Sequence, residues 1–214
     1  MKSDLFYRFG RTAIIVLIAC SMFNSVSAQV SDIGKSLINA KSAPMSAGDV
    51  YLLLLKNHVK INYEVGLNEN DKKELIMSNG TFSVNTLLEK LHSTLGYDFE
   101  RKDDRITIFT PSTRNLGDKY PLNVFIPHLR LENVDAYSAM QIMAKAIHAE
   151  IMCPTPPTKG EKNLLITLVL QNTSVRDALS QIAASAGYLG WQATAMVPES
   201  GSNKGHLFLM VNFN

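Results

Sequence analysis

Two stretches of this chain, TFSVNTLLEKLHSTLGY (81–97) and NTSVRDALSQIAASAGY (172–188), repeat one pattern that decides the predicted fold. Each contains a serine able to cap a helix, Ser83 or Ser174, and each ends in glycine followed by tyrosine. Between these limits the apolar residues recur at the spacing of one helix face. The sequence therefore predicts an internal repeat with one amphipathic helix in each copy.

The segment ahead of the first stretch predicts a helix followed by a strand. In GDVYLLLLKNHV (48–59) most apolar residues fall on one helix face, although Leu52 and Leu53 leave a buried strand as an alternative. KINYEV (60–65) then alternates polar and apolar residues, as a strand does. Helix then strand is the simpler interpretation.

Two further segments complete the first copy. KELIMSNGTF (73–82) predicts a short strand that runs to a turn at Asn79-Gly80. YDFERKDDRITIF (97–109) predicts a hairpin that turns at residues 102–104. The first copy thus reads as helix, strand, strand, helix and hairpin.

The second copy follows the same order. DAYSAMQIMAKAIHAEIM (135–152) repeats the helix-to-strand transition, and LLITLVL (164–170) takes the place of the short strand. NVFIPHLRL (123–131) adds a leading strand, and HLFLMVNFN (206–214) closes the chain. We predict an α+β fold of two small βαββα-type modules, each a three- or four-stranded sheet with two helices on one face.

Composition shifts along the chain predict its boundaries. Residues 29–47 are rich in Ser and Ala with little periodicity, and residues 110–121 are polar and punctuated by Pro and Gly. The expected division is a signal peptide (1–28), a tether (29–47), module 1 (48–110), a linker (111–122) and module 2 (123–214).

The N-terminal residues are typical of an export signal. Lys2, Arg8 and Arg11 precede or border an apolar run (12–23), and small residues follow it up to Ala28. The apolar run is shorter than the roughly 20 residues that a membrane-spanning helix needs. We expect cleavage after Ala28 and a periplasmic protein.

A second processing site competes with this one. Leu17-Ile18-Ala19-Cys20 resembles a bacterial lipoprotein box, in which the cysteine is lipidated. Lipidation at Cys20 would make the protein an outer-membrane lipoprotein, and membrane contact is expected only in that case. If the leader ends at Ala28, Cys153 is the one remaining cysteine, which leaves no internal disulfide.

The charge balance bears on the partner. The chain has 21 basic and 19 acidic residues, and loss of the leader removes three basic and one acidic residue, leaving 18 of each. A nucleic-acid binder needs a basic excess to neutralise phosphates. We therefore expect no nucleic-acid partner.

The repeated pattern resembles the short N-terminal domain shared by secretins and TonB-dependent transducers. In that family a strand leads into a small polar residue and Val at a helix start, and the helix ends at a glycine before another strand. Ser83-Val84 with Gly96-Tyr97, and Ser174-Val175 with Gly187-Tyr188, fit this pattern. The resemblance covers about 48–110 and 123–213, without the pore or barrel domain that usually follows.

The resemblance implies a cell-envelope protein that works by contact. Its expected role is accessory to the assembly or signalling of a secretin or TonB-dependent outer-membrane complex. The expected partner is an envelope protein such as a secretin, a TonB-dependent receptor or an anti-sigma-type regulator. The alternative is a periplasmic binding protein for a small ligand or cell-wall fragment, held near Trp191 and the proline loop (153–162).

Motifs for catalysis do not emerge from the sequence. The five histidines show neither HxxxH nor HExxH spacing, and no second cysteine lies near Cys153 to form a zinc pair. The chain also lacks a Gly-x-Ser-x-Gly elbow and a phosphate loop. We expect no catalytic residue, metal or cofactor.

Four residues near the C-terminus are candidates for partner binding: Tyr188, Trp191, Phe208 and Met210. Large aromatic side chains dominate interface energies, but strand aromatics usually pack inside, so packing of Trp191 under the last hairpin is the favoured interpretation. The closing strand carries apolar residues on both faces. It therefore lies either in the centre of the sheet or where a partner covers it. At a sheet edge it would offer unpaired backbone groups for strand addition.

Overall fold

The computed structural model describes residues 33–65, 73–152, 164–196 and 207–214. The predicted leader with Cys20, the polar segment 66–72 and the proline loop with Cys153 lie outside the described residues. The structure therefore does not test the predictions made for these segments.

The predicted helix and strand of the first half are both present. Helix α2 (Ala47–Lys56) begins at Ser46, whose Oγ accepts a hydrogen bond from the Asp49 N–H at 3.2 Å, and the Asp49 carboxylate accepts from the Ser46 N–H at 2.9 Å. This reciprocal capping box fixes the helix start. Strand β3 (Ile61–Val65) follows, so the buried-strand alternative for residues 48–59 is wrong.

The two repeated stretches form capped helices, as predicted. Ser83 Oγ accepts from the Thr86 N–H at 3.1 Å at the start of α3 (Val84–Lys90), and Ser174 Oγ accepts from the Asp177 N–H at 3.1 Å at the start of α6 (Val175–Ser185). A π-helical turn, η2 (Leu91–Leu95), extends α3. The repeat's glycines lie just beyond the helices in the left-handed region, with φ of 72° at Gly96 and 80° at Gly187.

The other helix of the second half has the same exit as α2. Helix α5 (Ala136–Ala146) starts at Asp135, whose carboxylate accepts from the Ser138 N–H at 2.8 Å. His148 follows α5 with a φ of 52°, as His58 follows α2 with a φ of 58°. In both cases the left-handed residue ends the helix and turns the chain into a strand, β3 or β9 (Ala149–Met152).

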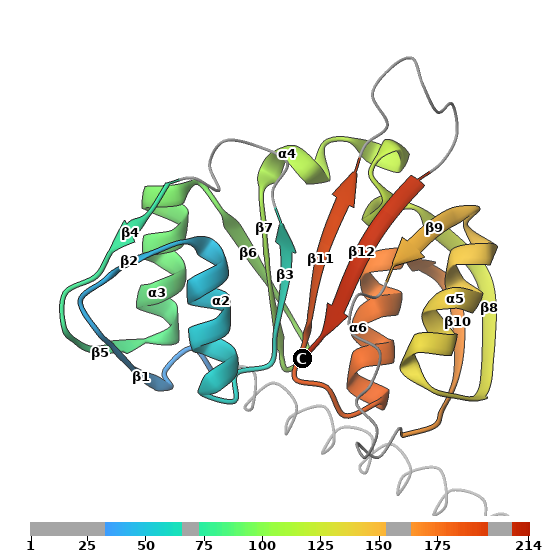
Figure 1. The fold of residues 1–214 in the computed structure, drawn as a ribbon, viewed down its shortest axis with the longest axis horizontal. Helices are drawn as coiled ribbons and strands as arrows, with labels where there is room; N and C mark the ends of the chain where they lie inside the picture. Colours follow the sequence, from blue (N-terminus) through green and yellow to red (C-terminus); the bar gives the residue numbers. More distant parts are fainter. Residues whose placement is uncertain (1–32, 66–72, 153–163, 197–206) are drawn as a thin grey trace, which may run out of the picture.

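A six-stranded mixed sheet crosses the middle of the molecule (Figure 1). Each half contributes a hairpin and the strand that follows its first helix, and the hairpin turn near Asp103 lies where it was predicted. Within the described residues, the order is β6 (Asp98–Lys102), β7 (Arg105–Phe109), β3, β11 (Trp191–Met196), β12 (Leu207–Phe213) and β9.

The sheet corrects the prediction that each half has a sheet of its own. Strands β3 and β11 pair in parallel, with Tyr63 opposite Gln192 and Val65 opposite Thr194. The two halves are therefore joined by backbone hydrogen bonding along one sheet. The predicted α+β class is confirmed. The predicted separate sheets of three or four strands are replaced by one six-stranded sheet, because β3 pairs with β11.

The helices of the two halves cover opposite faces of this sheet. Tyr63 belongs to the core formed with α2 and α3, whereas its neighbour Glu64 points to the other face, as successive strand residues do. Glu64 is in register with Ala193, which belongs to the core formed with α5 and α6. Figure 1 shows the two helix pairs on either side of the central strands.

Strands also lie on the outer side of the helices, so the helices do not simply rest on one sheet. In the second half, α5 and α6 lie between the central sheet and a two-stranded ribbon (Figure 1). The ribbons are β1 (Leu37–Ala40) with β5 (Gly80–Ser83), β2 (Pro44–Met45) with β4 (Leu75–Ile76), and β8 (Phe125–Val134) with β10 (Ile166–Ser174).

Two segments predicted to be loose are packed. Ile38 of β1 is 1% exposed in the first core, so the expected tether contributes a packed strand to the first half. The expected linker folds into α4 (Pro111–Arg114), η3 (Gly117–Lys119) and η4 (Pro121–Asn123), and Tyr120 and Leu122 are fully buried in the second core. Burial of these apolar side chains keeps both segments in place.

Candidate functional site

The closing strand β12 lies inside the sheet. It pairs antiparallel with β11 and parallel with β9, so both of its edges are occupied, and the idea of strand addition to β12 is corrected. Phe208 takes part through its backbone, opposite Met196 and Glu150. The Met210 side chain is half-buried.

Trp191 is fully buried in the second core. Its indole Nε1 donates a hydrogen bond to Ser180 Oγ at 3.1 Å, which satisfies the polar end of the ring. An indole with this burial has no surface to offer a partner. Trp191 therefore packs in the interior, and its assignment as a partner-binding residue is corrected.

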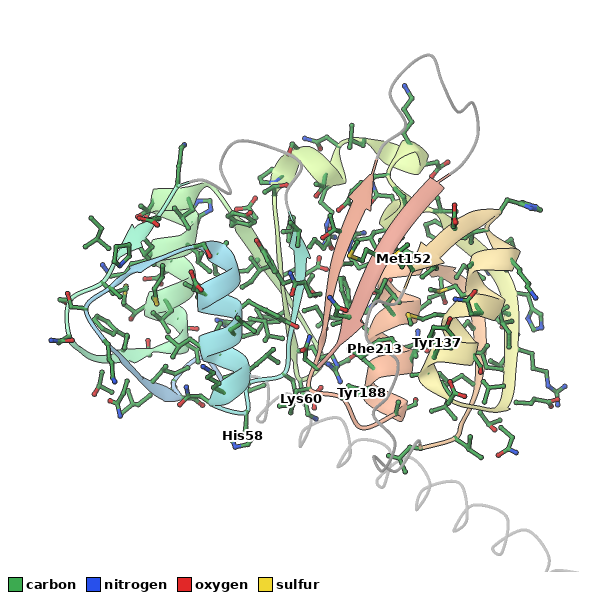
Figure 2. All side chains as sticks on the ribbon, viewed as in Figure 1. His58, Lys60, Tyr137, Met152, Tyr188 and Phe213 are labelled. Atoms are coloured by element: carbon green, nitrogen blue, oxygen red, sulfur yellow. The ribbon has the colours of Figure 1, made fainter. Side chains whose placement is uncertain are left out.

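Tyr188 and Phe213 stack on one another. Their ring centroids are 5.2 Å apart and the rings are inclined by 16°. Figure 2 shows the two side chains at the end of the central strands where β12 finishes. Both rings are half-buried against the second core, so Tyr188 contributes mainly to packing at this end of the sheet.

A buried ion cluster links the two halves on the α6 side of the sheet. Glu64 of β3 is fully buried, and Arg176 of α6 donates to both of its carboxylate oxygens, from Nε and, at 3.0 Å, from Nη2. Arg114 of α4 donates to Glu64 Oε1 at 3.2 Å. Two guanidinium groups thus satisfy the buried Glu64 carboxylate with charge-assisted hydrogen bonds.

Neighbouring groups extend this cluster. Arg114 Nη2 also donates to Glu100 at 2.9 Å, and its guanidinium lies 3.9 Å from the centre of the Phe109 ring. Arg176 Nη2 donates to Asn123 at 2.8 Å. Burial raises the pKa of the nearby Tyr120 phenol, and the negative charge of Glu64 raises it further. The cluster fixes α6 and α4 on the strands of the first half.

This cluster does not have the arrangement of a catalytic centre. The Glu64 carboxylate is occupied by arginines, so it is poorly placed to act as a general base. Within residues 33–65, 73–152, 164–196 and 207–214, no group of three or more His, Cys, Asp or Glu side chains is placed to hold a metal ion. We interpret the cluster as structural.

The β8–β10 ribbon has one buried and one exposed face. Apolar residues on its inner face, among them Ile126, Leu131 and Leu170, are nearly fully buried against α5 and α6. On its outer face Phe125 is 63% and Val169 55% exposed. Such alternation is usual for an antiparallel ribbon with one face in water.

Both outer edges of this ribbon lack a strand partner in the described part of the chain. Open edges are templates for pairing with another chain, and proteins commonly protect them with charge or proline. Strand β8 carries Pro127, Arg130 and Glu132, and the sheet edge β6 carries four charged residues among its five. Strand β10, ITLVLQNTS, has nine residues with no charge and no proline, so its edge is the least protected of these.

The uncharged composition of β10 is the one sequence feature that bears on this edge. Residues 164–170 were expected to form a strand, but the absence of charge over 166–174 marks an edge only once the strand order is known. The Glu64–Arg176 contact had no signal, because its partners are 112 residues apart. An alternating polar residue such as Glu64 is ordinarily expected to face water.

No described helix combines the length and the apolar character needed to cross a membrane. Comparison with known proteins gives no matching family model, no matching curated protein and no matching solved structure. The geometry of the chain itself is therefore the basis for interpreting its function.

Proposed function

We propose that this protein is a non-enzymatic interaction module of the cell envelope, which binds an extended segment of a partner along β10. Strand addition would pair the backbone of the partner with the open edge of β10 and extend the β8–β10 ribbon to three strands. The partner would be an envelope protein of the secretin, TonB-dependent receptor or anti-sigma-regulator kind.

The unprotected edge of β10 is the observation that carries this proposal. Between the register shift at Ile166–Leu168 and the left-handed Asn172, with a φ of 46°, the middle of this strand offers regular backbone donors and acceptors to a partner. Val169, 55% exposed on the outer face, offers an apolar contact beside that edge. Leu164 and Leu165, just ahead of the strand, are 50% and 58% exposed, so they extend the exposed apolar surface beside this edge.

The internal repeat supports the family that we propose. Ser83 and Ser174 cap their helices in the same way, and Gly96 and Gly187 both take left-handed conformations after them. These are the positions on which the resemblance to the short secretin and TonB-dependent transducer domain rests. We propose that residues 48–110 and 123–214 are two such modules, fused through β3 and β11.

Export and location belong to the same proposal. The N-terminal pattern favours a cleaved signal peptide and a periplasmic protein, with lipidation at Cys20 as the alternative. Mass spectrometry of the mature N-terminus distinguishes them, because a chain starting at Gln29 is unlipidated, whereas one starting at Cys20 carries lipid. An N-terminus that retains Met1 would contradict both routes.

The test of strand addition uses a photo-cross-linking residue at the exposed Thr167 of β10 in living cells. We expect a cross-link to one envelope protein, identified by mass spectrometry. Introducing a charge by Val169→Glu should reduce the cross-link at least tenfold, because charge on an edge strand disfavours pairing. Arg130 lies opposite Val169, so the new carboxylate has a nearby positive charge and the ribbon should still fold.

The matched control is Ile76→Glu, which places the same charge on an exposed apolar residue of the other half. Ile76 of β4 is 78% exposed. This variant should cross-link as the parent does. Equal cross-linking by Val169→Glu and the parent, or recovery of no envelope protein, would contradict the proposal.

A further inference from the structure

The middle of β10 pairs with a strand on one side only. Between the register shift at Ile166–Leu168 and the left-handed Asn172, residues 168–171 pair with β8, and no strand lies along their other edge within the described ranges. The ribbon lies at the right of Figure 1, beyond the helices of the second half. A second copy of the chain would bring an identical edge to this one.

Two-fold symmetry restricts how such an edge can pair with itself. In an antiparallel pair, residues opposite one another lie on the same face of the sheet. The two-fold axis must therefore pass beside one residue rather than between two. An axis beside Val169 uses the regular residues most fully, because it sets Val169 opposite its own copy and Leu168 opposite the partner's Leu170.

The side chains on both faces of the strand suit this register. On the outer face the two copies of Val169, each 55% exposed, would cover one another. On the inner face the half-buried Leu168 would lie opposite the partner's Leu170, and both residues already pack in the second core of their own chain. Cross-strand apolar pairs stabilise a sheet. The pairing would therefore cover apolar surface that the monomer exposes.

Charge distinguishes β10 from the other open edges. A charged residue beside a two-fold axis meets its own copy, and like charges directly opposite one another are destabilising. Strand β10 has no charged residue. In contrast, Arg130 lies near the middle of β8, and Glu100 is the central residue of β6. Self-pairing of β8 or β6 about its middle would bring like charges together.

The charges that flank the paired strands would lie far apart. Arg130 is opposite Val169 on the other side of β10. In a four-stranded sheet of order β8–β10–β10–β8, the two copies of Arg130 are three strand spacings apart, which is about 14 Å. This distance exceeds the Debye length of about 8 Å at physiological ionic strength. Arg130 also forms an ion pair with Glu132 of its own strand.

We propose that this protein forms a two-fold homodimer by antiparallel pairing of β10, and that the dimer blocks the edge that an envelope partner would use. The second half of this inference rests on the proposed function, because blocking matters only if a partner binds there. Four regular residues in each strand make a small interface, so the dimer should be weak and reversible. A partner that binds the free edge would draw the equilibrium towards the monomer.

The first test measures the mass of the purified full chain in solution. Sedimentation equilibrium at rising concentration should show monomer and dimer but no larger species, because two-fold pairing uses the edge of both copies. Val169→Glu should raise the dissociation constant at least tenfold, because it sets two carboxylates opposite one another. The matched control is Ile76→Glu, which adds the same charge to an exposed residue of the first half and should dimerise as the parent does.

The second test addresses the register by disulfide cross-linking. It uses the chain with Cys20→Ser and Cys153→Ser, so that an added thiol is the only one. Val169→Cys should form an intermolecular disulfide on mild oxidation, because residues opposite one another have Cβ atoms about 4.5–5.5 Å apart. Gln171→Cys, exposed on the same face, should cross-link at least tenfold more slowly, because its two copies would lie about 13 Å apart along the strands.

Three results would overturn the homodimer. The chain could stay monomeric at every concentration up to its solubility limit. Val169→Glu could dimerise as tightly as Ile76→Glu, which would place the contact on another face. Val169→Cys and Gln171→Cys could cross-link at the same rate, which would rule out pairing about Val169.

Failure of the homodimer is distinguishable from failure of strand addition. A chain that stays monomeric but cross-links to an envelope protein through Thr167 would leave the proposed function standing. A chain that dimerises about Val169 but cross-links only to itself would contradict the proposed function and leave the homodimer standing.

The blocking role has its own test, once the envelope protein is identified. The disulfide-locked Val169→Cys dimer should lose at least tenfold in binding to that protein, and reduction of the disulfide should restore binding. Equal binding by the locked and the reduced chain would show that the dimer does not block the edge.

Discussion

Gly190 lies in backbone contact with Ile61: a Cβ built on Gly190 would be 1.7 Å from the Ile61 carbonyl oxygen. The Ile61 N–H donates to the neighbouring Leu189 carbonyl at 3.1 Å, and Gly190 exchanges two hydrogen bonds of 3.0 Å with Asn214. The strands of both halves and the last residue of the described chain thus meet at one residue without a side chain.

We predict that Gly190→Ala opens the join between β3 and β11. The added methyl group would overlap a backbone atom, which cannot rotate away, so the free energy of unfolding should fall by about 3 kcal/mol or more. Urea unfolding followed by circular dichroism measures the change. Gly80→Ala is the control, because its nearest contacts are ring atoms of Phe82 at 3.6 Å. Equal stability of the two variants would contradict the steric argument.

The Glu64–Arg176 pair should show strong coupling in a double-mutant cycle. Arg176→Met leaves a fully buried carboxylate with Arg114 as its main remaining partner, and we expect a loss of about 3 kcal/mol. The double variant Glu64→Leu/Arg176→Met should lose clearly less than the sum of the single losses. Urea midpoints of the four proteins give the coupling, and strict additivity would show that the contact is not energetically important.

The two repeated serine caps should contribute equally and independently. Ser83→Ala and Ser174→Ala each remove one cap from a helix of a different core, and each should cost about 1 kcal/mol. Because the sites share no partner, the double variant should lose about the sum. Thermal unfolding of all three variants is the measurement, with the exposed Ser185→Ala as the control. A large difference between the two caps would speak against equivalent roles.

The stabilisation that the Ser46–Asp49 capping box gives to α2 should depend on pH. The hydrogen bond from the Ser46 side chain, and then that from its backbone, hold the pKa of Asp49 below its ordinary value. The unfolded state therefore binds the proton more readily, so the stabilisation is present above about pH 4 and is lost as the pH falls through the lowered pKa. Ser46→Ala should raise the pKa of Asp49 in an NMR titration, whereas Ser93→Ala should leave it unchanged. An unaltered Asp49 titration in Ser46→Ala would contradict the capping box.

Trp191 should behave as a buried indole. Its emission should be blue-shifted and poorly quenched by acrylamide, because the side chain is fully buried. Ser180→Ala removes the acceptor of its N–H and should cost about 1–3 kcal/mol, whereas Ser185→Ala on the same helix should change little. Strong quenching in the parent would restore Trp191 as a candidate for partner contact.

Local elements were predictable because their signals are local. Capping serines act on N–H groups three residues away, and the hairpin near Asp103 rests on one left-handed residue, φ 56°. The candidate binding edge was harder to predict from the sequence. Strand β10 was expected as a strand, but that its edge is open follows from the order of strands, which has no signature in a window of a few residues.

The expected tether and linker show another limit of the sequence. Both segments lack a strong period, and their anchors are a few apolar residues, such as Ile38 in one and Tyr120 and Leu122 in the other. A few apolar residues do not establish a periodicity, yet they hold a segment in place when a core is there to receive them. The same holds for Trp191, whose burial depends on α6 lying above it.

The sequence by itself determined the repeat, the helices and most of the strands, since their hydrogen bonds and apolar faces are set by residues close along the chain. Only the tertiary structure decided that the two halves share one sheet, that Glu64 meets Arg176, and that β10 has an unpaired edge in the described part of the chain. These features depend on which edges and faces fit together. That fit is settled by the missing side chain of Gly190 and by buried charge, neither of which leaves a period in the sequence.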